Sequence, residues 1–116
     1  MNMLNSVILE GDITKACDIV QFGGGRQMEV TIAVKRQFRR RDGTLADETS
    51  EFNVIAYGPT ADLLTKKGVI GQGIRVVGRL TQVKWEADGR QQSAVKLIAE
   101  HIEYKPSKKK EAEIEK

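Results

Sequence analysis

The chain has 116 residues, a formal net charge of +3 and a single cysteine, Cys17. This length suits one domain, and a lone cysteine excludes an intrachain disulfide and favours a reducing compartment. The sequence contains no apolar stretch near the ~20 residues of a membrane-spanning helix and no basic start followed by an apolar core, so no signal peptide is predicted. We therefore expect a soluble, cytoplasmic protein with no membrane partner.

Apolar runs and alternation predict a chain made mostly of strands. In one segment Met28, Val30, Ile32 and Val34 alternate with polar residues, which is the period of a half-buried strand. Strands are predicted over 7–13, 28–35, 52–57, 74–85 and 91–104, with a further extended piece over 18–22. The polar segment 43–50 shows no periodicity and is interpreted as a loop.

Glycines mark the turns between these strands. The run 23–25 is all glycine and supplies positive φ without strain, and Asp88-Gly89 is a hairpin signal. Gly78 lies inside a predicted strand, where glycine often marks a bulge or a barrel corner. The glycine run lacks the Lys-Ser/Thr and the helix of a phosphate-binding loop, so a turn is the expected structure.

One short helix is predicted between the third and fourth main strands. Pro59 suits its first turn, the segment 60–67 continues it, and Gly68 is a plausible stop. Five strands with one short helix in this place is the order of the OB-fold, a small Greek-key barrel. We predict an all-β OB-fold domain over residues 1–105 and a charged tail over 106–116 that is disordered or a frayed helix.

The sequence offers little catalytic chemistry. His101 is the only histidine and alternates with Ala99 and Leu97, which favours a place on the barrel wall or at an interface. Cys17 has no CxxC partner, and the acidic residues show no pairing suited to acid–base work. We expect no cofactor, no metal and no enzymatic activity.

The densest charge cluster surrounds an aromatic ring. Phe38 lies within the run Arg36-Gln37-Phe38-Arg39-Arg40-Arg41, which follows Lys35 and leads into a predicted hairpin tip. Single-stranded nucleic acid suits such a cluster, because its phosphates meet the arginines and its bases stack on the ring. A basic loop that only faces water is the alternative. Phe38 lies four residues after Val34, so a regular strand would point both side chains to the same face. A twist, a bulge or a rim position must therefore separate Phe38 from the core.

Other aromatic residues repeat this arrangement. Trp85 ends a predicted strand beside Lys84, with Arg90 beyond the next turn, and Tyr57 ends the middle strand. A tryptophan in this place can also cap the rim of the core. Two hairpins that each carry a ring beside cations favour binding that is strong but insensitive to sequence.

Several segments in this order resemble the bacterial single-stranded DNA-binding proteins. They are Ser6-Val7-Ile8-Leu9-Glu10-Gly11-Asp12-Ile13, Thr31-Ile32-Ala33-Val34, Ala46-Asp47-Glu48-Thr49-Ser50 and Val76-Val77-Gly78-Arg79-Leu80, running on to Lys84-Trp85. The resemblance covers roughly residues 4 to 105. It implies an OB-fold protomer, assembled as a homotetramer or alternatively a dimer, around which single-stranded DNA wraps in replication, recombination and repair, in the cytoplasm and associated with the nucleoid.

The resemblance also implies which residues meet DNA. The stacking aromatics fall on Phe38, Tyr57 and Trp85, while Phe52 is either a further platform or an interface residue, since Glu51 stands where many members carry an aromatic. The residues expected to meet phosphates are Lys35, Arg36, Arg39, Arg40, Arg41, Lys84 and Arg90, followed by Arg75, Arg79 and Lys96.

Two departures from the family bear on its partners. Pro59 replaces a basic residue that often follows the aromatic-Gly pair, so one phosphate contact is expected to be absent. The segment 106–116 has neither the Gly/Pro/Gln-rich linker nor the acidic tip that recruits replication and repair proteins, so that partnership is doubtful and the chain is a short variant or a truncated form. The competing interpretations are a primosomal replication-restart OB adaptor and a protein-interaction OB module.

Overall fold

The computed structural model describes residues 2–106, apart from the side chain of Phe22, and six strands and one helix occur in that part. The predicted tail from Ser107 onward lies outside the described residues. The elements are β1 (Val7–Ala16), β2 (Val20–Phe22), β3 (Gly25–Arg39), β4 (Leu45–Tyr57), α1 (Gly58–Lys67), β5 (Gly73–Ala87) and β6 (Arg90–Tyr104).

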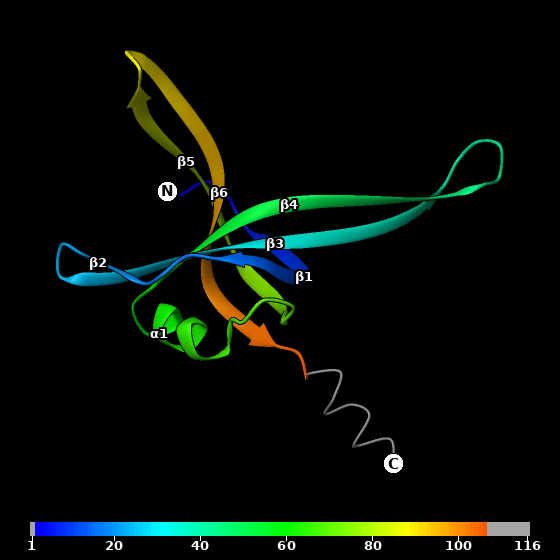
Figure 1. Cartoon of the computed structure of the whole chain (residues 1–116). Coiled ribbons are helices and arrows are strands. Elements are labelled where there is room, and N and C mark those ends of the chain that lie inside the picture. The colour runs from blue at the N-terminus through cyan, green and yellow to red at the C-terminus, as the bar shows by residue number, and fades with distance from the viewer. Residues whose placement is uncertain (1, 107–116) are drawn as a thin grey trace.

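Five of these strands close into a barrel (Figure 1). The hydrogen-bonded order is β1-β5-β6-β4-β3, and a further pairing of β1 with β3 completes the ring. β4 and β6 pair in parallel and the other neighbours pair antiparallel. β2 pairs only with β3 and stays outside the ring. With α1 between the third and fourth barrel strands, the predicted OB-fold is confirmed.

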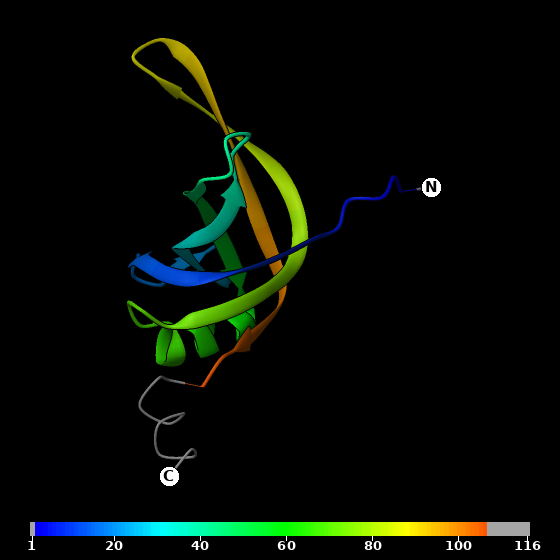
Figure 2. The same cartoon turned by 90° about the vertical axis from the view of Figure 1, so that its right-hand side faces the viewer.

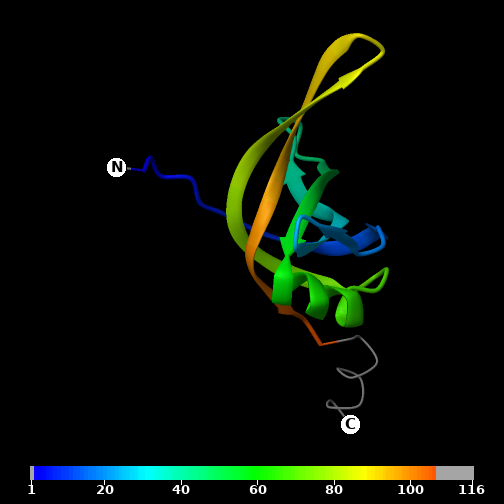
Figure 3. The same ribbon diagram turned by 90° about the vertical axis from the view of Figure 1, so that its left-hand side faces the viewer.

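Aliphatic side chains fill the barrel. Ile13, Ile32, Leu64, Ile74 and Leu97 are the largest of the fully buried side chains. They come from four strands and from α1, so the helix closes one end of the barrel (Figure 3). Among the described residues no aromatic or charged side chain is fully buried. Tyr104 packs against this core and is partly buried, whereas Phe52, Tyr57 and Trp85 are exposed.

The glycine predictions hold at Gly78 and at the Asp88-Gly89 turn. The β5–β6 register shifts between Val77 and Gly78, which is a bulge, the first of the two predicted alternatives. A Cβ atom at Gly78 would lie 1.9 Å from the carbonyl oxygen of Ile98, so only glycine fits this crossing. At the β5–β6 turn Asp88 and Gly89 have φ of 51° and 74°, the pair of positive angles of a tight hairpin.

The helix begins and ends close to the predicted places. Pro59 lies in its first turn, and its last turn carries Lys66 and Lys67, which favour the negative end of the helix. The backbone N–H of Gly68 donates to the carbonyl of Leu64 at 2.7 Å and ends the helix.

The interpretation of residues 43–50 as a loop is wrong, because β4 begins at Leu45. β3 and β4 pair from Gln27–Tyr57 to Arg39–Leu45 without a register shift, and the tip is only residues 40–44. Asp42 closes this tip by accepting hydrogen bonds from the backbone N–H and the hydroxyl of Thr44. This part of the ribbon extends beyond the barrel, so both faces meet water and no alternation marks the strand.

Candidate nucleic-acid interface

Two hairpin arms project from the barrel in different directions (Figures 1 and 2). The β3–β4 arm comprises residues 35–49, and the β5–β6 arm comprises residues 81–96. Each arm is a continuous two-stranded ladder, so its side chains alternate strictly between two faces. The register therefore fixes which functional side chains share a face.

The predicted stacking residues are accessible. The exposed fractions of Tyr57, Trp85 and Phe52 are 48%, 45% and 40%, and Phe38 is partly buried. The guanidinium carbon of Arg36 lies 5.6 Å from the ring centroid of Phe38, a cation–π distance. Exposed rings of this size on strands are the platforms that base stacking needs.

Phe38 and Phe52 lie on one face of the β3–β4 ribbon. Phe38 is opposite Ala46 and Phe52 is opposite Ile32, whose side chain points into the barrel. We call this the inner face, because it continues from the barrel interior. The β3–β4 register has no shift between Val34 and Phe38, so no bulge separates them. Of the predicted alternatives, the rim position is the one observed: Phe38 points to the same side as the core residues but lies beyond the core.

Tyr57 and Trp85 lie on the other side of the sheet, the outer face. Tyr57 is opposite Gln27, one residue out of phase with the inward-pointing Met28–Ala56 pair. The parallel pair Ile55–Ile98 carries this outer face from β4 to β6. The β5–β6 ladder then carries it without a shift to Trp85, which is opposite Gln92.

The predicted phosphate contacts divide into compensated and uncompensated charges. Within residues 2–106, six of the predicted cations form no ion pair: Lys35, Arg39, Arg40, Arg41, Lys84 and Arg90. Arg36 and Arg79 lie at long distances of 3.8 and 3.9 Å from Glu48 and Glu100. All eight remain candidates, because exposed pairs of this kind are weak.

Arg75 has carboxylate partners on two neighbouring strands. Its guanidinium lies 2.9 Å from Glu10 and 3.2 Å from Glu103. The hydrogen bond and the charge of Glu10 raise the pKa of Arg75 further above its usual value, and Lys105 and Arg75 lower the pKa of Glu10. Arg75 is therefore committed to this cluster and is a poor candidate for a phosphate contact.

Lys96 is also paired, in the middle of the outer face. Its Nζ lies 2.9 and 3.0 Å from the two carboxylate oxygens of Glu29, and the side chains are only 19% and 25% exposed. Lys96 belongs to β6 and Glu29 to β3, so the pair crosses the β4 strand between them. Sequence reasoning missed this pair, because residues 67 positions apart meet only through the strand order.

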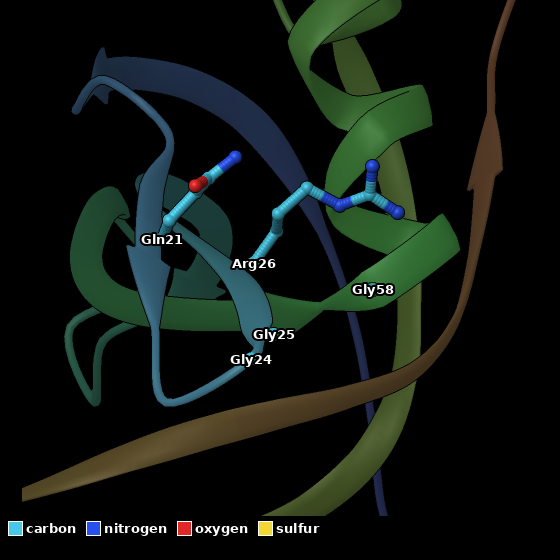
Figure 4. A pocket seen from close by; sticks show the side chains of 5 residues that line it. All are labelled: Gln21, Gly24, Gly25, Arg26 and Gly58. Atoms are coloured by element: carbon cyan, nitrogen blue, oxygen red, sulfur yellow. The ribbon is translucent and has the colours of Figure 1, made fainter.

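The glycine run forms the β2–β3 turn, as predicted, and it borders a pocket of about 360 Å³ (Figure 4). The lining residues are Gln21, Gly24, Gly25, Arg26 and Gly58. Arg26 extends toward α1, where its guanidinium lies 2.7 Å from Asp62. Arg26, the one cation among the lining residues, is thus neutralised by a carboxylate. The glycines themselves act as the turn between β2 and β3.

Other predicted features lie away from the arms. His101 is exposed on the barrel wall of β6, 3.7 Å from Glu103, and Cys17 is exposed. Within residues 2–106 no group of three or more His, Cys, Asp and Glu side chains forms a metal-binding arrangement. The one described helix is too short to cross a membrane.

Comparisons with known proteins agree with this fold. The chain is 35% identical over 101 residues to the single-stranded DNA-binding protein of Aquifex aeolicus, covering 86% of this chain and 69% of that protein. It is 26% identical over 108 residues to the one of Helicobacter pylori, covering 91% of this chain and 60% of the relative.

Solved structures and a family model lead to the same assignment. A deletion variant of the Thermus aquaticus single-stranded DNA binding protein matches with a TM-score of 0.80 at 28% identity, over 90% of this chain and 52% of that one. The SSB of Plasmodium falciparum in complex with ssDNA shares the fold, with a TM-score of 0.82 at 21% identity over 91% and 98% of the two chains. The model of the single-strand binding protein family matches residues 4–105. The chain belongs to the single-strand binding protein family.

Proposed function

We propose that this protein binds single-stranded DNA without sequence preference and coats exposed strands during replication, recombination and repair. The observation that carries the proposal is the set of exposed rings beside uncompensated cations on both arms of a family OB-fold. Rings accept any base by stacking, and cations neutralise phosphates regardless of sequence. Stacking on the rings is the contribution that favours the open strand, because only unpaired bases can stack there.

The proposed action is passive. Bound protein blocks re-pairing of the strand and shields it from nucleases, and no bond is made or broken, so we assign no enzymatic activity and no cofactor. The proposed assembly is a homotetramer, with a dimer as the alternative, in the cytoplasm and associated with the nucleoid. Mass measurement in solution separates the two assemblies.

A fluorescence titration with oligo-dT tests the binding. Trp85 is the only tryptophan of the chain, so quenching of its emission reports stacking at one known place. Trp85→Ala should weaken binding, measured by anisotropy of labelled DNA, by about 1–3 kcal/mol, whereas Trp85→Phe should keep most of the affinity. If oligo-dT neither quenches Trp85 nor binds by anisotropy, the proposed function fails.

Salt dependence tests the phosphate contribution separately. If about six phosphates are neutralised per protomer, log K should fall with log salt concentration at a slope near −4, from ~0.7 per phosphate of single-stranded DNA. Arg40→Gln should make this slope shallower by roughly 0.7. An affinity that does not change with salt would remove the electrostatic part of the proposal.

A further inference from the structure

We propose that each protomer carries two separate tracks for single-stranded DNA, one on each face of the sheet. The inner track holds Phe38 and Phe52, and the outer track holds Tyr57 and Trp85. This inference rests on the proposed function and adds an element to it: two DNA segments can occupy one protomer at the same time.

The inner track runs along the β3–β4 arm toward the barrel. Phe38 lies near its tip with Arg36 over the ring, and Phe52 lies at its base beside the core residue Ile32. The positions of Phe38 and Ile32 are six residues apart on β3, which is about 20 Å of strand. Val34 and Ser50 fill the floor between them, so the track offers rings at both ends and a cation in between.

The outer track crosses the barrel wall. Tyr57 and Trp85 lie on the same sheet surface, and the buried pair Ile55–Ile98 forms the floor that joins β4 to β6. Glu29 is the carboxylate beside this floor, and its charge is compensated by Lys96 at 2.9 Å. The surface above this floor therefore carries the Lys96–Glu29 pair and the cation Arg79 opposite Ile98, which suits DNA better than an uncompensated carboxylate would.

The two tracks are kept apart because their rings lie on opposite faces of the sheet. The nearest rings of the two tracks, Phe52 and Tyr57, are five residues apart on β4, about 17 Å of strand, and this odd spacing places them on opposite faces. On the outer face of the arm, Asp47 and Glu51 lie beside Lys35 and Arg39, so their charges balance and this stretch does not draw phosphates from Tyr57 along the arm. A short DNA segment that follows one face therefore contacts the rings of that face only.

Two single-tryptophan proteins report the tracks independently. The natural chain reports the outer track through Trp85. The double variant Phe38→Trp with Trp85→Phe keeps a ring at both positions and moves the tryptophan to the inner track. The ligand is an oligo-dT of about five nucleotides, near the lower end of the 4–16 nucleotides that one OB-fold covers, so that it spans the rings of one track and little more.

Matched ring removals on each background form the test. In the protein that keeps Trp85, Tyr57→Leu should lower the affinity for oligo-dT measured by Trp85 quenching about five- to 150-fold. Phe38→Leu should change that affinity less than about twofold. In the Phe38→Trp with Trp85→Phe variant, Phe52→Leu should lower the affinity measured by quenching of the new tryptophan. Tyr57→Leu should leave that affinity unchanged. A ring removal that weakens both reporters alike, or neither, overturns the two tracks.

Stoichiometry is the second readout. Calorimetry with the same oligonucleotide should give two bound strands per protomer, and Phe38→Leu combined with Phe52→Leu should reduce this number to one. A single strand per protomer that quenches both reporters would also overturn the inference while leaving single-stranded DNA binding intact. Absence of any binding would instead refute the proposed function.

Discussion

Replacement of Lys96 by methionine tests what the one well-shielded ion pair of the outer face does. The substitution removes the ammonium group and keeps an unbranched side chain of similar length. It leaves Glu29, whose side chain is 25% exposed, without the partner that now lies 2.9 and 3.0 Å from its two oxygens. The double variant Glu29→Gln with Lys96→Met removes both charges and is the matched control.

The structure sets the size of the expected effects. The pair is neither fully exposed nor fully buried, so loss of one partner should cost about 1–3 kcal/mol of unfolding free energy, between the surface and the buried limits. If a phosphate passes roughly 8 Å from the uncompensated Glu29 carboxylate, repulsion is about 0.5–2 kcal/mol at an effective dielectric constant between water and a protein surface. The affinity for oligo-dT should thus fall roughly two- to 30-fold.

The two variants distinguish this role from a direct phosphate contact. Urea unfolding and anisotropy titrations at fixed salt should both show a loss in Lys96→Met and a recovery of most of it in the double variant. If Lys96 contacted phosphate directly, both variants would lose the same affinity and both would have a shallower salt slope. That result would refute the assignment of Lys96 as the partner that neutralises Glu29.

The remaining predictions concern the bulge and the acid limb of stability. Gly78→Ala places a Cβ 1.9 Å from a backbone oxygen and should lower the unfolding free energy by at least about 1–3 kcal/mol. Gly73→Ala on the same strand meets its nearest neighbours, side-chain atoms of Asp12 and Lys105, at 3.3 Å and should change stability little; equal thermal shifts would contradict the bulge geometry. The pKa of Glu10 is lowered in the folded chain by Lys105 and Arg75, so its stabilisation is present above the unfolded value near 4.5 and is lost as the pH falls through the folded pKa. Glu10→Gln should therefore flatten the loss of stability below about pH 4.5, and superimposable acid profiles would disprove this linkage.

Local patterns were sufficient for much of the fold. The alternation of Met28 to Val34, the turn at Asp88-Gly89 and the helix that follows Pro59 depend on neighbours in sequence, and the structure confirms each. A bulge or a barrel corner was predicted at Gly78, because glycine inside a strand often marks one of the two, and the register shift shows a bulge. Residues 45–50 were missed, since a strand that faces water on both sides has no alternating pattern.

The residues of the candidate interface were identified without the structure, but their grouping was not. The sequence supplied the rings, the arginine cluster and the barrel order, because these are properties of residue type and local period. The tertiary structure decided that Tyr57 and Trp85 share one face, that Phe38 and Phe52 share the other, and that Lys96 neutralises Glu29. Such groupings follow from hydrogen-bond ladders between strands far apart in the chain, and a ladder that closes a barrel is set by packing of the whole core.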